Sequence, residues 1–314
     1  MTRVHDHFSK SEIQAFCQRS DLRAWVTILT NWALLGLSFA LVAWQANALT
    51  VVIALIVIGG RQLGCGALMH ECGHGSLFAS KKLNQMVGNW LGAAPVLYRL
   101  DDYMNNHLKH HRCIGTRDDP DLHRYERFPV SAASLRRKLW RDATGRTSWK
   151  NLVASLYSNK ILYVNPRGQK RLSVRLLLQR WYAPLISNFL ILAVLSAFGQ
   201  PLLYLIWVAA YFSTYMVFSR IRNLAEHAAV PDLSSEDPLH NTRTTIPRWW
   251  ERLTFAPNSV NYHLEHHLVP SIPKYRLAQF HKALRDKGLL EQADICQGYA
   301  EVVKKLATPA AAVA

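Results

Sequence analysis

Two long segments of this sequence contain neither a charged residue nor a histidine, and they constrain the fold more than any other feature. The first covers residues 24–60 and the second covers residues 181–219, and arginine bounds each segment on both sides. A helix needs about 20 apolar residues to cross a hydrocarbon layer roughly 30 Å thick. Each segment is therefore long enough for two membrane-spanning helices and too long for one core helix of a soluble protein. A soluble α/β enzyme is excluded.

Each segment has a polar break near its centre, which divides it into a helical hairpin. The breaks are Gln45-Ala46-Asn47 and Gly199-Gln200-Pro201. We expect four spans, at residues 24–44, 48–68, 181–198 and 202–219. The sequence therefore predicts an all-α integral membrane protein. Its four transmembrane helices form two hairpins beneath a cytoplasmic, histidine-rich helical cap, and residues 1–314 form a single domain.

The distribution of basic residues predicts the orientation. The chain has 37 Lys and Arg against 21 Asp and Glu, but neither hairpin turn contains Lys or Arg. The positive-inside rule therefore places both termini and the long central segment in the cytoplasm. A signal peptide over residues 1–48 is a competing interpretation. It is disfavoured because the apolar run exceeds the roughly 7–15 residues of such a core, and cleavage would leave the second span without its partner.

Residues 124–180 form a basic segment with fourteen Lys and Arg and two acidic residues, interleaved with Leu, Trp and Tyr. This pattern predicts an amphipathic helix at the membrane interface. Two explanations of its positive charge have equal weight: positive-inside bias alone, and a docking surface for an acidic partner. Nucleic-acid binding is disfavoured, because the aromatic residues follow helical spacing beside two membrane hairpins. Residues 306–314 are expected to form a disordered tail.

Five cysteines show no spacing typical of a zinc ribbon, an iron–sulfur site or a disulfide framework, and they suit a reducing compartment. The candidate chemistry lies instead in the histidines, nine of which fall in three clusters and one satellite. The clusters are His70 with His74, then His107, His110 and His111, then His263, His266 and His267, and the satellite is His227.

Within each cluster the first histidine is three or four residues from the others, so on a helix it shares a face with them. A structural zinc site takes four ligands, and the three clusters alone supply eight imidazoles. We therefore expect two metal ions. Imidazole ligands without thiolate permit Zn, Cu, Fe or Ni, so the ligand type does not identify the metal.

Five acidic residues lie close to the histidines in the sequence: Glu71, Glu226, Glu265, Asp119 and Asp121. We expect them to accept hydrogen bonds from the distal ring N–H groups of the ligands. The alternative is that they only satisfy local helix electrostatics. Of the other histidines, His5, His7 and His281 are expected outside the site. His123 and His240 each follow an acidic, proline-containing turn, and the sequence does not decide whether they contact the site.

These patterns resemble the three histidine boxes of the membrane fatty acid desaturase and hydroxylase superfamily. The sequences are His-Glu-Cys-Gly-His at 70–74, His-Leu-Lys-His-His at 107–111 and His-Leu-Glu-His-His at 263–267. Arg-Asp-Asp-Pro-Asp at 117–121 adds to the similarity, and residues 261–273 look most like acyl-lipid desaturases. Residues 223–227 are similar to the stretch after the fourth span of acyl-CoA desaturases. The resemblance covers roughly residues 25–285.

The resemblance implies two iron ions, with His227 as a ninth ligand and Asn223 holding a metal-bound water. Zinc can replace iron in purified protein. The implied reaction is O2-dependent removal of hydrogen from a long-chain fatty acyl lipid, which leaves a double bond, and no catalytic residue is expected apart from the ligands. The electrons then come from a separate ferredoxin, rubredoxin or cytochrome with its reductase. An acidic face on that donor would suit the basic segment.

Three alternatives differ in class. The serious one is a hydroxylase or ketolase of the same superfamily that acts on fatty acids, alkanes or carotenoids. His-Glu-x-x-His at 70–74 also matches a membrane zinc metalloprotease, but that interpretation leaves the second and third clusters without a role. A metal transporter should carry ionisable residues within its spans, and residues 24–60 and 181–219 contain no charged residue and no histidine.

Overall fold

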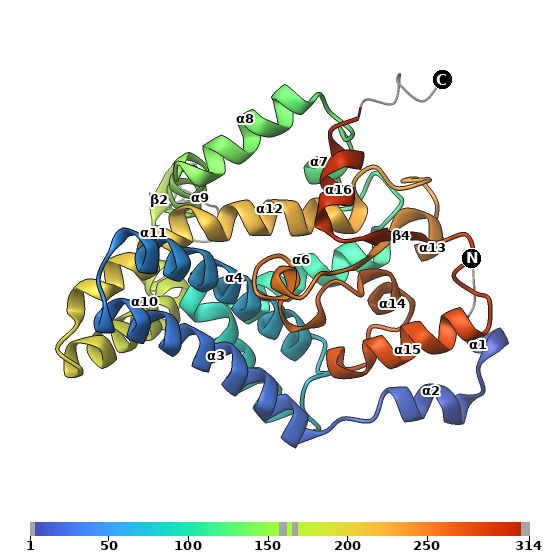
Figure 1. Ribbon diagram of the computed structural model, residues 1–314, viewed down its shortest axis with the longest axis horizontal. Coiled ribbons are helices and arrows are strands. Elements are labelled where there is room, and N and C mark those ends of the chain that lie inside the picture. Colours follow the sequence, from blue (N-terminus) through green and yellow to red (C-terminus); the bar gives the residue numbers. More distant parts are fainter. Residues whose placement is uncertain (1–3, 157–161, 165–168, 309–314) are drawn as a thin grey trace.

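The computed structural model describes residues 4–156, 162–164 and 169–308, and most of them are helical. Within this part of the chain, four helical segments are long and apolar enough to cross a membrane, as predicted. These segments are Lys10–Trp44, Ala48–Gly73, Val174–Ala197 and Pro201–His227. Helices α10 (Val174–Ala197) and α11 (Tyr204–Phe212) lie at one end of the molecule, and both chain ends lie toward the other (Figure 1).

The helix bounds differ from the predicted spans where helices continue beyond the apolar sequence. Helix α3 is Asp21–Trp44. Helix α4 (Ala48–Gly73) begins with a capping box between Asn47 and Thr50 and passes the predicted end at residue 68. The predicted fourth span is broken at Ser213, whose φ of −125° and ψ of −89° are not helical. Helix α12 (Thr214–His227) follows the break, so the first histidine cluster and the satellite His227 both lie at the ends of helical segments that begin as apolar spans.

Helix α4 is the central element and packs against α3, α11, α12 and the π-helix η1 (Gly88–Ala93). Two glycines make these approaches close. A Cβ atom on Gly59 would lie 2.2 Å from Thr214 Oγ1, and one on Gly60 would lie 2.0 Å from the Leu253 carbonyl oxygen. Small residues at helix contacts allow backbones to meet in this way. The packing of α4 therefore fixes the position of the first histidine cluster.

The fold also contains two small sheets, so the prediction of an all-α protein was wrong in this detail. Strand β1 (Leu162–Val164) pairs antiparallel with β2 (Lys170–Leu172), and β3 (Arg243–Ile246) pairs parallel with β4 (Asp294–Gln297). In the second sheet Arg243 Nη2 lies 2.7 Å from Asp294 Oδ2, and both side chains are buried. Strands of three or four residues are too short to give a clear periodic pattern in the sequence.

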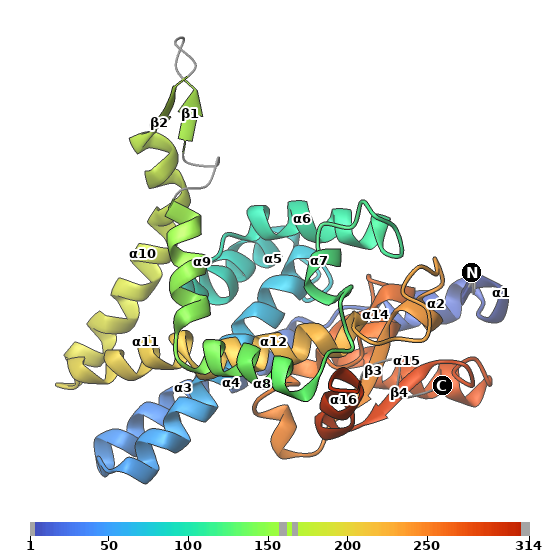
Figure 2. The same ribbon diagram turned by 90° about the horizontal axis from the view of Figure 1, so that it is seen from above.

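The basic segment 124–180 forms more than the single interfacial helix that the sequence predicts. It contains α8 (Ala132–Ala143), α9 (Arg146–Leu156) and the β1–β2 pair, and residues 157–161 and 165–168 lie outside the described residues. Helix α8 is tied to α12, because Arg220 Nη2 donates to the buried Asp142 Oδ1 at 2.8 Å. Figure 2 shows α8 alongside α12. Trp140 and Trp149 stay 65% and 62% exposed.

The disordered tail was predicted to begin at residue 306, which is too early. Helix α16 (Tyr299–Leu306) ends at a fully buried leucine, and the Leu306 carbonyl accepts a hydrogen bond from Val130 N at 3.0 Å. The apolar contacts of Leu306 outweigh the tendency of a chain end to fray. Residues 309–314 lie outside the described residues.

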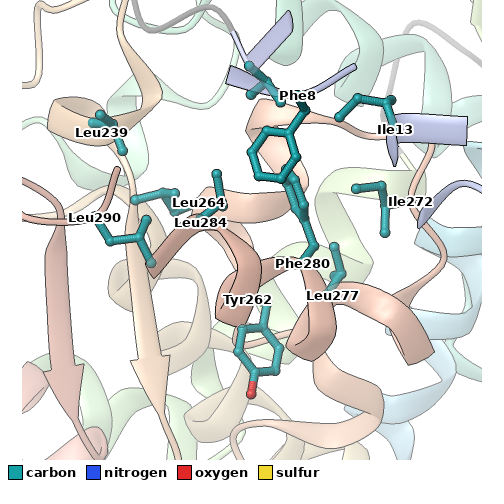
Figure 3. Close-up of a cluster of buried hydrophobic side chains, with 11 residues drawn as sticks. Phe8, Ile13, Leu239, Tyr262, Leu264, Ile272, Leu277, Phe280, Leu284 and Leu290 are labelled. Atoms are coloured by element: carbon teal, nitrogen blue, oxygen red, sulfur yellow. The ribbon is translucent and has the colours of Figure 1, made fainter. Parts of the chain in front are cut away.

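The N-terminal segment packs against the C-terminal part of the chain. The rings of Phe8 and Phe16 lie 5.8 and 5.2 Å from that of Phe280, where α2 (Lys10–Phe16) meets α15 (Lys274–Asp286). Figure 3 shows this apolar cluster, which includes Leu264 of α14 (His263–Leu268). These apolar contacts therefore hold the histidines of residues 263–267 in place.

The remaining elements are helix α6 (Leu100–Cys113), which carries the second histidine cluster, and short elements that connect these parts. The short elements are α1 (Val4–His7), α5 (Lys81–Val87), η2 (Ala94–Val96), α7 (Leu122–Tyr125), η3 (Pro201–Leu203), α13 (Pro238–Asn241), η4 (Trp250–Arg252) and η5 (Pro257–Ser259).

Candidate metal centre

The structure brings all nine histidines of the three clusters and the satellite into two adjacent groups. In each group, one ring nitrogen of every member lies within 4.8 Å of the others. No other histidine among the described residues joins either group. The first group is His70, His74, His107, His111 and His266, and the second is His110, His227, His263 and His267.

The second and third clusters each contribute to both groups. On α6, His107 and His111 are one turn apart and face the first group, whereas His110 faces the second. Helix α14 divides its histidines in the same way, and α12 adds His227 at its end. The rings of His111 and His267 stack across the boundary, with centroids 4.2 Å apart. Two shared helices therefore hold the two groups side by side.

The ring nitrogens converge within each group. His107 Nε2 lies 2.9 Å from His74 Nε2 and 3.0 Å from His111 Nε2. In the second group, His227 Nε2 lies 2.8 Å from His263 Nε2 and 3.2 Å from His110 Nε2. Imidazoles converge on one point in this way when they share a metal ion.

In each group, one buried Nε2 atom lacks a protein partner. The Nε2 atoms of His70 and His267 have no hydrogen-bond partner among the described residues. An unpaired buried polar atom is costly, and a metal ion within each group would give these atoms a partner. The all-imidazole donor set fits a divalent first-row metal. The residues present therefore fit two metal ions.

Burial keeps five of these imidazoles neutral. It lowers the pKa of His107, His263, His266 and His267 well below the ordinary value, and the neighbouring imidazoles add to the effect. The same causes lower the pKa of His111 to about 2. Neutral imidazole is the form that binds metal, so these five side chains need not lose a proton to act as ligands at neutral pH.

Three of the five expected carboxylates lie against distal ring nitrogens. Glu71 Oε1 is 3.0 Å from His70 Nδ1, and Glu226 Oε1 is 3.1 Å from His263 Nδ1. Asp119 Oδ1 lies 2.9 Å from His110 Nδ1, and the Tyr125 hydroxyl also donates to Asp119. Contacts of this kind fix the tautomer and the orientation of a ligand histidine.

One further partner of a ring nitrogen could not be found from side-chain motifs. His227 Nδ1 lies 3.1 Å from the main-chain carbonyl oxygen of Asn241. A main-chain oxygen leaves no residue-type signal in the sequence, because every residue carries one.

The other two acidic residues, Glu265 and Asp121, have different partners. The structure therefore differs from the prediction that they accept hydrogen bonds from ring N–H groups of the nine histidines. Glu265 accepts from His281 Nδ1 and from Thr244 Oγ1, each at 2.5 Å. Glu265 lies two residues from His263, and positions two apart on a helix do not face the same way. Asp121 lies in the turn before α7 and pairs with Arg124 at 3.2 Å.

The contacts of Asn223 and of three other histidines, His123, His240 and His281, are also defined. Asn223 Oδ1 accepts from Arg222 Nη1 at 3.0 Å. His123 Nδ1 lies 3.0 Å from the Pro120 carbonyl oxygen, and the main-chain carbonyl of His240 accepts from Asp232 N. His281 is outside both groups, as expected, but it contacts α14 through Glu265.

A cavity of about 280 Å³ adjoins the two groups. His70, His107, His110, His227 and His263 line it. Its walls also carry four arginines, Arg99, Arg124, Arg180 and Arg222, and three acids, Asp102, Asp121 and Glu226. A second cavity of about 900 Å³ lies among α3, η1, α10 and α11, has an almost wholly apolar wall and shares no lining residue with the first. The histidines therefore face a small, charged space.

Residues 44–295 match the family model described as "Fatty acid desaturase", which covers most of the chain. The chain belongs to the fatty acid desaturase family. It is therefore an oxidoreductase, and the family together with the four candidate spans supports an integral membrane protein. The sequence-based recognition of this superfamily is confirmed.

Three relatives illustrate the range of named activities. A dihydrorhizobitoxine desaturase of Bradyrhizobium elkanii is 27% identical over 77% of this chain and 70% of its own length. An sn-1 oleoyl-lipid 12-desaturase of Synechocystis sp. is 24% identical over 84% of this chain and 76% of its own length. An acyl-lipid (8-3)-desaturase of Thraustochytrium sp is 24% identical over 79% of this chain, which spans about three fifths (59%) of that relative.

Proposed function

We propose that this chain is an O2-dependent desaturase that uses two iron ions to introduce a double bond into a long-chain fatty acyl lipid. The observation that carries the proposal is the pair of adjacent all-imidazole groups in a chain of the desaturase family. The five histidines of the first group would hold one ion and the four of the second group the other. Zinc can replace iron in purified protein, because it outranks ferrous iron in affinity for such sites.

Iron at these groups would supply the reduction of O2 and the removal of hydrogen from an unactivated C–H bond. The protein contributes orientation. Glu71, Asp119 and Glu226 lie against distal ring nitrogens, which leaves the Nε2 atoms of those histidines free to face the ions. A substrate in the 280 Å³ cavity would meet histidines of both groups, and so would have its reacting carbon close to both ions.

The membrane arrangement is part of the proposal. The spans form two hairpins of one domain, and the histidine-bearing ends of α4 and α12 enter a cap in the cytoplasm together with both termini. The support is the absence of Lys and Arg from the turns at 45–47 and 199–201 and their abundance elsewhere.

A separate protein would supply the electrons. Arg136, Arg137 and Arg141 are exposed on α8 and would attract the acidic face of a ferredoxin, a rubredoxin or a cytochrome with its reductase. The same exposed surface carries Trp140, which suits the headgroup region of a bilayer.

The reaction is tested in a host that lacks this enzyme. We would express the chain, convert total lipids to methyl esters and compare them by mass spectrometry. The proposal predicts acyl chains that have lost two hydrogens, and no such change with His110→Ala. The matched control, His123→Ala, should keep the activity because His123 lies outside both groups. Gain of one oxygen would indicate the hydroxylase instead, and unchanged acyl chains would contradict a fatty acyl substrate.

A second candidate is desaturation of a smaller polar substrate. It is favoured by the small volume and charged wall of the cavity at the histidines. One relative is also named for dihydrorhizobitoxine, whereas others are named for acyl lipids. Mass spectrometry of the water-soluble metabolites of the same cells tests this candidate.

A further inference from the structure

The cavity beside the histidine groups is lined by residues with unused hydrogen-bond donors. Arg180 Nε, Trp181 Nε1 and Arg222 Nε are buried, and none has a hydrogen-bond partner among the described residues. All three residues line the cavity. Buried donors without an acceptor are rare in folded proteins, so a group of three on one cavity indicates a missing occupant.

The carboxylates of the cavity wall do not meet this need, because each already pairs with an arginine. Asp102 Oδ2 accepts from Arg180 Nη1 at 3.0 Å, and Asp121 Oδ1 lies 3.2 Å from Arg124 Nε. Glu226 Oε1 forms an ion pair with Arg222 Nη2 at 2.5 Å, although this oxygen has no hydrogen-bond partner among the described residues. The fourth arginine, Arg99, has Asp101 at 4.0 Å as its one acidic partner among the described residues, and Asp101 does not line the cavity. The wall therefore keeps an excess positive charge.

Unused N–H donors and excess positive charge together select an anion. Guanidinium and indole N–H groups donate and cannot accept, so their partner must offer lone pairs. Hydrogen bonds from arginine to a carboxylate or phosphate are stronger than those to a neutral acceptor. An anionic oxygen group satisfies these donors better than a neutral ester does.

We propose that Arg180 and Trp181 on α10, together with Arg222 on α12, bind an anionic group of the substrate, a carboxylate or a phosphate. This inference rests on the second candidate of the proposed function, desaturation of a smaller polar substrate, and names the group that the enzyme recognises. The cavity is only about 280 Å³ and reaches five of the histidines, so the anionic group and the reacting carbon lie close together in the substrate. The apolar 900 Å³ cavity is separate and does not reach the histidines.

Binding of matched probes tests the anion site. Purified full-length protein with its metal, in phosphatidylcholine nanodiscs, would be titrated with hexanoate and oleate against their methyl esters. A further pair would be 1-oleoyl lysophosphatidic acid against monoolein. We expect at least one charged probe to bind about tenfold or more tightly than its uncharged counterpart. Preference for hexanoate indicates a small acid, for oleate a free fatty acid, and for the phosphate probe a lipid headgroup.

Two variants test whether the proposed residues cause the preference for charged probes over uncharged ones. Trp181→Phe removes the indole N–H and keeps an aromatic ring, and Arg180→Gln removes the guanidinium. Each should reduce the charged-over-uncharged ratio several-fold, whereas Arg175→Gln should leave it unchanged, because Arg175 is an exposed arginine on the same helix. If Arg180→Gln fails to fold after losing its contact with Asp102, Trp181→Phe decides.

Equal binding of charged and uncharged probes by the wild type would overturn the anion site, since ordered water would then suffice for the donors. An unchanged ratio in both variants would overturn it as well. The expression experiment separates this failure from failure of the proposed function. New double bonds without a charge preference would refute only the anion site. A charge preference without any desaturated product would refute only the function.

Discussion

A hydrogen bond at one ring nitrogen of a histidine determines which way the other nitrogen faces. His110 shows the dependence most clearly, because Asp119 contacts its Nδ1 with both carboxylate oxygens, at 2.9 and 3.0 Å. Burial raises the pKa of Asp119, but hydrogen bonds with His110 and Tyr125 outweigh burial and leave that pKa below its ordinary value. Asp119 therefore stays ionised at neutral pH and is a strong acceptor for the ring N–H.

We expect Asp119→Asn to lower metal affinity or activity by about 10- to 100-fold, because the amide is a weaker acceptor of nearly the same shape. Asp118→Asn is the matched control, since the neighbouring aspartate is exposed. Metal titration and product analysis would be run on both proteins. Equal metal affinity and activity in the two variants would show that the Asp119 contact does not support the site.

Helix α4 links the membrane part of the molecule to the histidines, and its close contacts define where His70 lies. Residues 250–259, which include η4 and η5, reach α4 at Gly60, where no side chain fits. Thr214 meets the same helix at Gly59 and donates to the Leu55 carbonyl oxygen at 2.6 Å. A change at these contacts would therefore shift the whole element.

Gly60→Ala should destabilise the protein by about 1–3 kcal/mol, because its Cβ would overlap the Leu253 carbonyl oxygen and backbone atoms must move. Gly36→Ala on α3 meets nothing within 4 Å and should be neutral or stabilising by up to about 1 kcal/mol. Thermal unfolding in detergent compares the two. Equal melting temperatures would show that the packing of α4 tolerates a side chain at residue 60.

At the scale of the whole molecule, local sequence patterns predicted which histidines lie together but not how they divide into two groups. The spacings of three and four placed His107, His110 and His111 on one side of a helix, as the structure has them. Which of them joins which group depends on the helices packed opposite, and no local pattern contains that information. The break at Ser213, the parallel β3–β4 pair and the contact of Glu265 with His281 likewise depend on tertiary packing.

The orientation of the whole molecule is tested by reporter fusions. Fusions at Asn47 and Gln200, in the two turns, should report the outer side of the membrane, because neither turn carries the basic residues that stay in the cytoplasm. A fusion after residue 308 should report the cytoplasm. A cytoplasmic signal from either turn would contradict the arrangement of two hairpins.

Metal content per chain tests the central claim most directly. Active protein analysed by inductively coupled plasma mass spectrometry should contain two metal ions per chain, because His70, His74, His107, His111 and His266 form one group and His110, His227, His263 and His267 form the other. His227→Ala should weaken binding in the second group most, and His281→Ala should retain both ions. One metal ion per chain, or none, in active protein would contradict the account.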